Sequence, residues 1–217
     1  GGCGAAAWWA AAAMALAGTL VAAAACGDVD GVRQKIDVEG AHPDEADTLG
    51  HTALHHASLA GMLGMVELML AYGANVNAVN AQGKSCLQYA AHNGAPEVVQ
   101  TLLEHGANVN HASADGKTAL HSAIGNNFPD VGALLIAVGA DINAREKASN
   151  STVLHKAAAK GFTDCVRLLY GHGADVNDRN AAGDTPLSLA RAAQFDDIVA
   201  VLTGPPPPRG QWWADDG

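Results

Sequence analysis

Basic residues and aromatic residues are both scarce in this sequence. Phe, Trp and Tyr make up 5% of the 217 residues, while Ala and Gly are abundant, a composition expected where helices pack closely. Lys and Arg number 12 against 22 Asp and Glu, so the formal net charge is −10 at pH 7. A general nucleic-acid-binding protein needs a basic face that displaces counterions from phosphates. The sequence therefore predicts a protein without a nucleic-acid partner.

Cysteine is also infrequent, and its spacing excludes two kinds of site. The four cysteines are Cys3, Cys26, Cys86 and Cys165, and no two of them have the spacing of a metal site or a redox motif. Cys86 and Cys165 fall at apolar positions of the sequence. We predict that both are reduced core residues of an intracellular, most simply cytoplasmic, protein.

A strongly hydrophobic run is missing, although no residue from Gly1 to Gly27 carries a charge. About 20 apolar residues would span a bilayer, but alanine dominates this stretch, is only weakly apolar, and is interrupted by Gly18. A secretory signal would need a basic start, which the chain lacks. We therefore expect residues 1–18 to form an Ala-rich lead, helical or disordered, and expect no membrane association. A membrane-anchored adaptor would require residues 5–25 to partition into lipid.

The most informative feature that is present is an internal repeat. The phrase Gly116-Lys-Thr-Ala-Leu-His-Ser-Ala123 recurs in altered form, with starts at positions 50, 83, 116, 150 and 183 and therefore steps of 33, 33, 34 and 33 residues. A second phrase, of the type Gly-Ala-Asn-Val-Asn, keeps this period and begins at Gly73, Gly106, Gly139 and Gly173. A fixed period in this range is typical of a solenoid, whose stacked units share one continuous core.

Each repeat contains the same signals for two helices. A hydroxyl can cap the first helix, and a glycine nine residues later can end it in the left-handed region. The caps are Thr52, Ser85, Thr118 and Thr152, and the glycines are Gly61, Gly94 and Gly161. The second helix has an apolar stripe, and the chain then runs into a turn tipped by Gly50, Gly83, Gly116 or Gly183. These signals predict an all-α solenoid of stacked antiparallel helix pairs with β-hairpin-like loops.

The two ends of the array differ from its interior. Residues 19–46 and residues 180–203 keep only part of the pattern, so we interpret them as terminal repeats that expose one side to water. Four full repeats lie between them, over residues 47–79, 80–112, 113–145 and 146–179. Four consecutive prolines in residues 204–217 indicate an extended tail or linker.

The third full repeat departs from the pattern. Asn127 stands where glycine is expected, and Gly125, Pro129 and Gly132 lie in or near the two helices. Glycine inside a helix costs about 1 kcal/mol relative to alanine. We therefore predict that this repeat is the least stable one in the interior of the array.

Residues from about 20 to 203 resemble an array of ankyrin repeats, whose signature runs Gly-x-Thr-Pro-Leu-His-x-Ala-Ala-x-x-Gly. The recurring phrases carry the resemblance, which covers most of the chain. It implies paired antiparallel helices, hairpin loops at right angles to them, a concave protein-binding face and no catalysis. It also implies that His55, His121 and His155, which share one repeat position, hydrogen-bond the neighbouring loop.

Two short motifs resemble the end of a phosphate-binding loop. They are Gly83-Lys-Ser and Gly116-Lys-Thr. A phosphate-binding loop also needs a glycine five residues earlier, so that its backbone can cradle phosphates. Ala78 and His111 occupy those positions, so we expect no nucleotide cofactor.

The histidines and hydroxyls do not form an evident metal site or catalytic site. His51 and His55 are four residues apart, but no cysteine or carboxylate is in place to complete a metal site. His121 and Ser122 are adjacent in sequence, and no acid is evident to orient them for nucleophilic catalysis. The sequence therefore predicts no catalytic residue, no cofactor and no metal.

By the same resemblance, partner-binding residues lie at the hairpin tips and at the outward positions of the first helices. Those positions hold His51, His56, Leu59, Gln82, Lys84, Tyr89, His92, Asp115, Lys117, Ser122, Asn126, Lys147, Ser151, Lys156 and Lys160. Five of the 12 basic residues and one acid fall in this set, which suggests a locally basic face. Two interpretations stay open: the lysines attract an acidic or phosphorylated segment of a partner, or they only keep the hairpins soluble.

These inferences predict a monomeric, non-catalytic scaffold or adaptor that binds a protein partner on its concave face. The alternative is that the array is the targeting or regulatory module of a larger enzyme or channel. A transcript that extends past either end of the sequence would favour the alternative.

Overall fold

The structure, a computed structural model, describes residues 19–205. These residues form two compact units, residues 19–108 and residues 109–205. Throughout residues 19–205 the regular elements are helices, which confirms the predicted all-α repeat fold. The predicted Ala-rich lead and almost all of the predicted Pro-rich tail lie outside the described residues.

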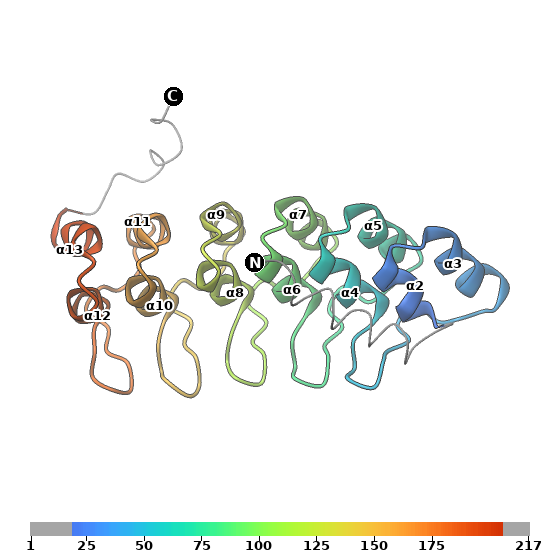
Figure 1. The fold of residues 1–217 in the computed structure, drawn as a ribbon, viewed down its shortest axis with the longest axis horizontal. Helices are drawn as coiled ribbons and strands as arrows, with labels where there is room; N and C mark the ends of the chain where they lie inside the picture. Colours follow the sequence, from blue (N-terminus) through green and yellow to red (C-terminus); the bar gives the residue numbers. More distant parts are fainter. Residues whose placement is uncertain (1–18, 206–217) are drawn as a thin grey trace, which may run out of the picture. The chain divides into compact units, whose positions relative to one another are not determined.

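The first unit contains three helix pairs. In each pair, one helix lies next to the hairpin loops, and the other helix lies farther from the loops (Figure 1). The pairs are α2 (Leu20–Cys26) with α3 (Val29–Arg33) and its continuation η1 (Gln34–Val38), α4 (Ala53–Ala60) with α5 (Leu63–Ala71), and α6 (Cys86–Asn93) with α7 (Pro96–Glu104).

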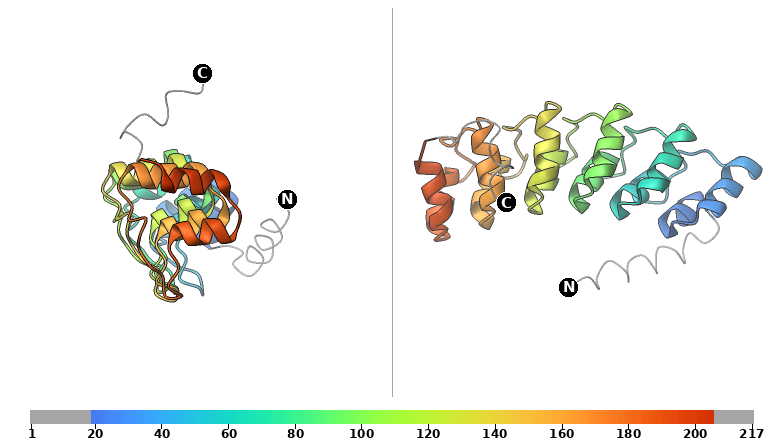
Figure 2. Two further views of the ribbon diagram at one scale, coloured as in Figure 1. Left: turned by 90° about the vertical axis from the view of Figure 1, so that its left-hand side faces the viewer. Right: turned by 90° about the horizontal axis from the view of Figure 1, so that it is seen from above.

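The second unit repeats this arrangement with three more pairs. The two helices of each pair lie side by side, as the views in Figure 1 and Figure 2 agree. The pairs are α8 (Ala119–Gly125) with α9 (Pro129–Ala137), α10 (Val153–Lys160) with α11 (Thr163–Gly171), and α12 (Pro186–Ala192) with α13 (Asp196–Thr203). No helix within residues 19–205 has the length and apolar character needed to cross a membrane.

The first helix of each full repeat begins at the predicted hydroxyl residue. The hydroxyl of Thr52 accepts a hydrogen bond from the backbone N–H of His55 at 3.4 Å, and the His55 ring accepts one from the backbone N–H of Thr52 at 3.2 Å. This reciprocal capping box satisfies N–H groups that the helix itself leaves unpaired. Gly61 then ends α4 with a φ of 68°, which glycine adopts without steric cost. The same box forms at Ser85, Thr118, Thr152 and Thr185.

Small residues in the first helices and branched residues in the second helices make the core. Ala57 of α4 and Ala90 of α6 are fully buried, and the two helices pack against each other. The small alanine side chain lets the helices approach closely. Val66 and Met69 of α5 and Leu102 of α7 are also fully buried. Burying each large apolar side chain is worth about 1.5–3 kcal/mol, so these side chains stabilise the packing within and between the helix pairs.

The hairpin loops of adjacent repeats are joined by hydrogen bonds. In the first unit, the backbone N–H of Ala81 donates to the carbonyl of Leu49 at 3.0 Å. The side chain of Asn77 donates to the carbonyl of Gly106 at 3.1 Å and accepts from the backbone N–H of Asn108 at 2.8 Å. The recurring asparagine of the second phrase therefore ties one repeat to the next.

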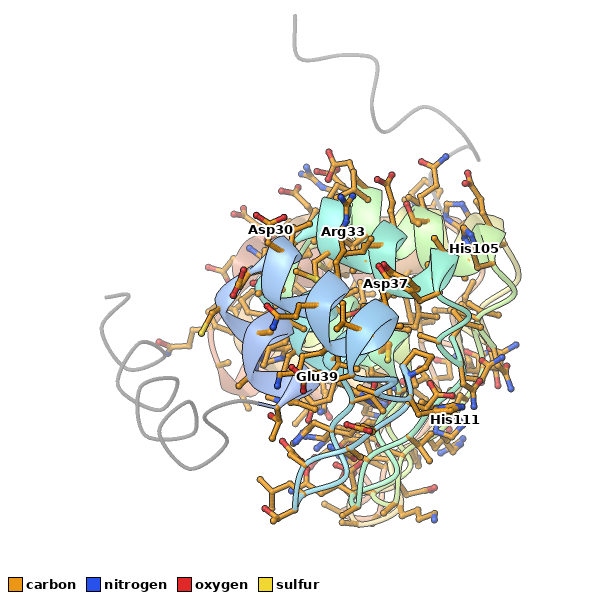
Figure 3. All side chains as sticks on the ribbon, turned by 90° about the vertical axis from the view of Figure 1, so that its right-hand side faces the viewer. Asp30, Arg33, Asp37, Glu39, His105 and His111 are labelled. Atoms are coloured by element: carbon orange, nitrogen blue, oxygen red, sulfur yellow. The ribbon has the colours of Figure 1, made fainter. Side chains whose placement is uncertain are left out.

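The first repeat is atypical, as a terminal repeat is expected to be. Its second helix begins at the Asp28 cap, which accepts from the backbone N–H of Gly31 at 2.9 Å, and continues as η1 with wider π-type turns. Figure 3 shows charged side chains on this repeat, among them the labelled Asp30 and Arg33 of α3, Asp37 of η1 and Glu39 directly after η1. Charged residues on a terminal repeat keep the end of the stack soluble.

The third full repeat compensates for some of its departures from the pattern. Asn127 has a φ of 61°, the left-handed conformation that glycine has in other repeats and that asparagine tolerates better than most residues. Gln194 replaces glycine in the last repeat in the same way, with a φ of 60°. Pro129 is the first residue of α9, where its missing N–H costs nothing. A Cβ atom on Gly132 would lie 2.9 Å from Cδ1 of Ile124, so glycine there permits close packing.

Gly125 remains unfavourable in this repeat, and the stability prediction therefore stands. A Cβ atom on Gly125 would meet nothing within 4 Å, so no close contact requires glycine at the end of α8. We expect the amides of residues 118–137 to exchange with deuterium faster than the equivalent amides of residues 85–104 and 152–171. Finding residues 118–137 to be the best-protected segment would contradict the prediction.

Candidate functional site

The predicted binding residues lie on the hairpin loops and on the first helices of the repeats. The exposed ones are Gln82, His92, Asp115, Asn126, Lys147 and Lys160. The partly buried ones are His51, His56, Leu59, Lys84, Tyr89, Lys117, Ser122 and Lys156. Ser151 differs from the expectation, because only 8% of its surface is exposed and its side chain is not accessible to a partner. The structure brings some of the set together in each unit: His51, His56, Lys84 and Tyr89 in the first, and Asp115, Lys117 and Lys156 in the second.

Asp47 lies at the centre of the cluster in the first unit. One carboxylate oxygen, Oδ1, accepts hydrogen bonds from the backbone N–H groups of Leu49 at 2.8 Å and His51 at 2.9 Å, and so shapes the hairpin turn. The other oxygen, Oδ2, lies 3.1 Å from Nε2 of His56 and 3.4 Å from Nδ1 of His51. A hairpin carboxylate therefore brings together two histidines, one from the loop and one from α4.

Asn80 fixes the other side of the His51 ring. Its side-chain oxygen accepts from the backbone N–H groups of Gln82 and Lys84, both at 2.9 Å, which leaves the amide nitrogen pointing toward the rings. That nitrogen lies 2.9 Å from Nε2 of His51 and 3.0 Å from the hydroxyl of Tyr89. Because an amide nitrogen only donates, Nε2 of His51 accepts, and the ring proton of neutral His51 is on Nδ1, facing Asp47.

The charges of this cluster follow from burial and hydrogen bonding. Burial would raise the pKa of Asp47, but the hydrogen bonds from the His51 backbone, the His56 ring and the Leu49 backbone together lower it below its usual value. Burial lowers the pKa of His51, although the nearby Asp47 opposes this effect. Burial also raises the pKa of Tyr89. At neutral pH the cluster therefore holds a carboxylate, a neutral His51 ring and a neutral phenol.

Glu146 takes the equivalent place in the second unit. Its carboxylate forms an ion pair with Lys156 of α10 and lies 3.8 Å from Nζ of Lys117 in the preceding hairpin. Asp115 accepts from Nζ of Lys117 at 2.6 Å and from the hydroxyl of Ser113 at 2.6 Å. The hydrogen bond that Lys117 donates to Asp115 is the main reason that the pKa of Lys117 is raised, and the same bond lowers the pKa of Asp115. Two predicted lysines are thus held in place by carboxylates.

Three residues that organise the two clusters were not among the predicted binding residues. Asp47, Asn80 and Glu146 occupy corresponding positions at the start of the hairpin turn, where each side chain reaches its own repeat or the preceding one. The repeat period already placed them in register, since Asp47 and Asn80 each precede a tip glycine by three residues. What the period could not indicate is that their side chains contact the outward residues of the first helices.

The three histidines of the common repeat position are structural. Nδ1 of each ring accepts the backbone N–H of the capping threonine at 3.2 Å, so Nε2 carries the proton. Nε2 of His55 donates to the carbonyl of Lys84 at 3.1 Å, and Nε2 of His155 donates to the carbonyl of Asp184 at 3.0 Å. Burial lowers the pKa of His55 and of His121 to about 4. The rings of His55 and His155 thus connect their repeats to the following loop, as the family resemblance implied, whereas Nε2 of His121 is buried without a hydrogen-bond partner of good geometry in the described part of the chain.

Among the described residues, one group combines histidine and carboxylate donors closely enough to hold a metal ion. It consists of Asp47, His51 and His56, whose donor atoms all lie within 4.8 Å of one another. The repeat pattern did not predict a carboxylate beside His51, because Asp47 precedes the turn.

Comparison with known protein families is consistent with this architecture. The model of one family, described as Ankyrin repeats (3 copies), matches residues 20–113, 82–146 and 133–206. Together these matches cover nearly all of the described residues and most of the chain. A search of curated proteins found no match.

Proposed function

Because the chain belongs to the ankyrin repeat family, whose repeats are general protein–protein interaction modules, we propose that it is a monomeric, non-catalytic scaffold or adaptor. The partner binds at the hairpin tips and the outward positions of the first helices. The segment that it offers is acidic or phosphorylated, and complementary charge draws it to the lysines of the second unit.

The ordered lysines of the second unit are the observation that carries this proposal. Lys117, Lys147, Lys156 and Lys160 all lie on the hairpins or on α10, whereas the carboxylates among them are Asp115 and Glu146. Ion pairs with these carboxylates hold Lys117 and Lys156, which reduces the side-chain entropy that binding would otherwise cost. An acidic protein thus presents a surface with more positive than negative groups.

The cluster in the first unit offers an aromatic anchor for a protein partner. Tyr89 is partly exposed, and its ring centroid lies 5.6 Å from that of His51 in an edge-on contact. Nζ of Lys84 lies 5.9 Å from the centroid of the Tyr89 ring. Rigid aromatic residues beside basic groups often contribute most of the binding energy at protein interfaces.

A cytoplasmic location is part of the proposal. Cys86 and Cys165 are fully buried free thiols, and burial raises the pKa of Cys86 well above its ordinary value and that of Cys165 to about 12. Buried thiols of this kind behave as small apolar core residues and suit a reducing compartment.

Replacing lysines of the second unit tests the proposal with a defined ligand pool. We expect the wild-type chain to enrich acidic sequences from a displayed peptide library, and the Lys117→Gln/Lys156→Gln variant to bind those peptides about tenfold more weakly, about 1.4 kcal/mol. Dissociation constants measured at two salt concentrations would show the loss to be electrostatic.

Arg167→Gln provides the matched control, because Arg167 lies on α11, the second helix of its pair, away from the hairpins. It removes one positive charge from the same unit and should leave peptide affinity unchanged. Enrichment of peptides without acidic residues, or equal affinity of the double lysine variant and the wild type, would contradict the proposed site.

A further inference from the structure

We propose that Asp47, His51 and His56 form a binding site for a divalent transition-metal ion, with Zn²⁺ as the ion that their chemistry fits. The three residues come from one hairpin and the helix that follows it, so a single repeat provides the site. His51 and His56 also belong to the proposed partner-binding face, but none of the three residues lies in the lysine cluster of the second unit, and zinc binding can be measured without a peptide.

The distances between the donor atoms are close to those in a tetrahedral zinc site. Ligand atoms about 2.0–2.2 Å from a tetrahedral ion lie about 3.3–3.6 Å from one another. Oδ2 of Asp47 lies 3.4 Å from Nδ1 of His51 and 3.1 Å from Nε2 of His56, so two of the three edges need little change. The third edge, between the two ring nitrogens, is at most 4.8 Å and would shorten when both rings turn toward the ion.

The donors also suit the ion chemically. Two imidazoles and one carboxylate are ligands that zinc prefers, whereas calcium and magnesium prefer sites made of oxygen ligands. The side chain of Asp47 is 8% exposed, that of His56 is 15% exposed and that of His51 is 19% exposed, so the three side chains are mostly buried. Nδ1 of His51 is buried without a hydrogen-bond partner of good geometry, which leaves an unsatisfied polar atom that an ion would satisfy. Three protein ligands leave one position for water or for a ligand from a second molecule.

The hydrogen bonds behind His51 determine how strongly the site binds. When Nδ1 coordinates the ion, the ring proton moves to Nε2, where the hydroxyl of Tyr89 lies 3.0 Å away and can accept it. The amide nitrogen of Asn80, 2.9 Å from Nε2, then opposes this proton because both groups are donors. A carboxylate at position 80 would accept the proton instead and would complete the carboxylate–histidine–metal arrangement that strengthens zinc binding.

Zinc titration of the full-length chain without a histidine tag tests the proposal. We expect calorimetry to show one zinc ion bound per chain, and Co²⁺ to give a visible d–d spectrum that Zn²⁺ abolishes. Loss of a residue that only hydrogen-bonds a metal ligand weakens metal binding by roughly 10–100-fold. His56→Gln removes a ligand itself and should therefore weaken zinc binding by more than this. Asn80→Asp should tighten binding by about tenfold.

Two control variants separate the site from general effects of substitution. His105→Gln removes a histidine at the end of α7, which Figure 3 labels and which does not belong to the cluster. Asn180→Asp makes the same change at the equivalent position of another hairpin, where the side-chain oxygen also accepts two backbone N–H groups. Both controls should bind zinc like the wild type.

The proposal would be overturned if the wild type bound no zinc, or if His56→Gln and Asn80→Asp both bound it with wild-type affinity. Imidazole resonances of the wild-type protein provide a second measurement that needs no substitution. Zinc should shift the ring nitrogens of His51 and His56 and leave the other histidines in place. Shifts confined to other histidines or to cysteines would also refute the site.

Discussion

Replacing Gly116 by alanine is expected to destabilise the protein by roughly 3–4 kcal/mol. Gly116 has a φ of 83°, and an added Cβ atom would lie 2.9 Å from the backbone nitrogen of Lys147 and 3.0 Å from the carbonyl oxygen of Arg145. The left-handed conformation alone costs an L-residue about 1–2 kcal/mol. The clash would also disturb the hydrogen bond from the Lys147 N–H to the Asp115 carbonyl, which is 2.9 Å long and joins two hairpins.

Gly183→Ala separates these two contributions. Gly183 is the tip glycine of the last hairpin and has nearly the same φ, 85°, but an added Cβ atom there meets nothing within 4 Å. We expect Gly183→Ala to cost only the conformational term of about 1–2 kcal/mol. Urea unfolding followed by circular dichroism would measure both values. Equal losses for the two variants would show that contact between adjacent hairpins contributes nothing.

His121→Gln is expected to make the protein less sensitive to acid. Burial first, and then the positive charge of Lys156, lower the pKa of His121 to about 4, although Glu146 opposes this effect. The unfolded chain has a histidine pKa of about 6.5, so between these two values the unfolded state binds a proton that the folded state does not. Stability is therefore complete above pH about 6.5 and falls as the pH decreases toward about 4.

The expected loss from this one histidine between pH 7 and pH 4.5 is about 2–3 kcal/mol, because one pKa unit corresponds to about 1.4 kcal/mol. Glutamine suits the position, since Gln88 stands there in the second full repeat and accepts the backbone N–H of Ser85 at 2.9 Å. The variant should keep most of its stability at pH 7 and lose about 2–3 kcal/mol less than the wild type on acidification.

Urea unfolding at pH 7 and pH 4.5 measures this difference directly. His105→Gln is the matched control, because His105 is exposed and should affect acid stability little. If His121→Gln lost as much stability on acidification as the wild type does, burial of the neutral ring would not be a source of acid sensitivity. His55→Gln should behave like His121→Gln, since burial also lowers the pKa of His55 to about 4.

The sequence predicted the fold because the signals that build each repeat are local. The hydroxyl of Thr52 and the left-handed Gly61 are separated by one helix, and both act on backbone groups within a few residues. Their recurrence every 33 or 34 residues then repeats the same pair of helices. The sequence could not show that Asn127 and Gln194 adopt the left-handed conformation of the glycines that they replace, because few residue types other than glycine do so.

The candidate sites were predicted only in part, because the contacts that build them are not local signals of one repeat position. The family resemblance placed His51, His56, Lys117 and Lys156 at the hairpin tips and outward positions of the repeat. It did not identify Asp47 and Glu146 as their partners, nor show that Ser151 is buried.

The repeat, its caps and its turns can therefore be read from the amino-acid sequence alone. Which side chains meet across a hairpin depends on the three-dimensional packing. Asp47 reaches His56 because the turn folds the chain back onto the following helix, and Lys117 approaches Glu146 because two successive hairpins lie side by side. Such contacts depend on how the turns fold and how the repeats stack. The two residues of a contact are separated by different numbers of residues in the two clusters, so the repeat period does not predict the contact.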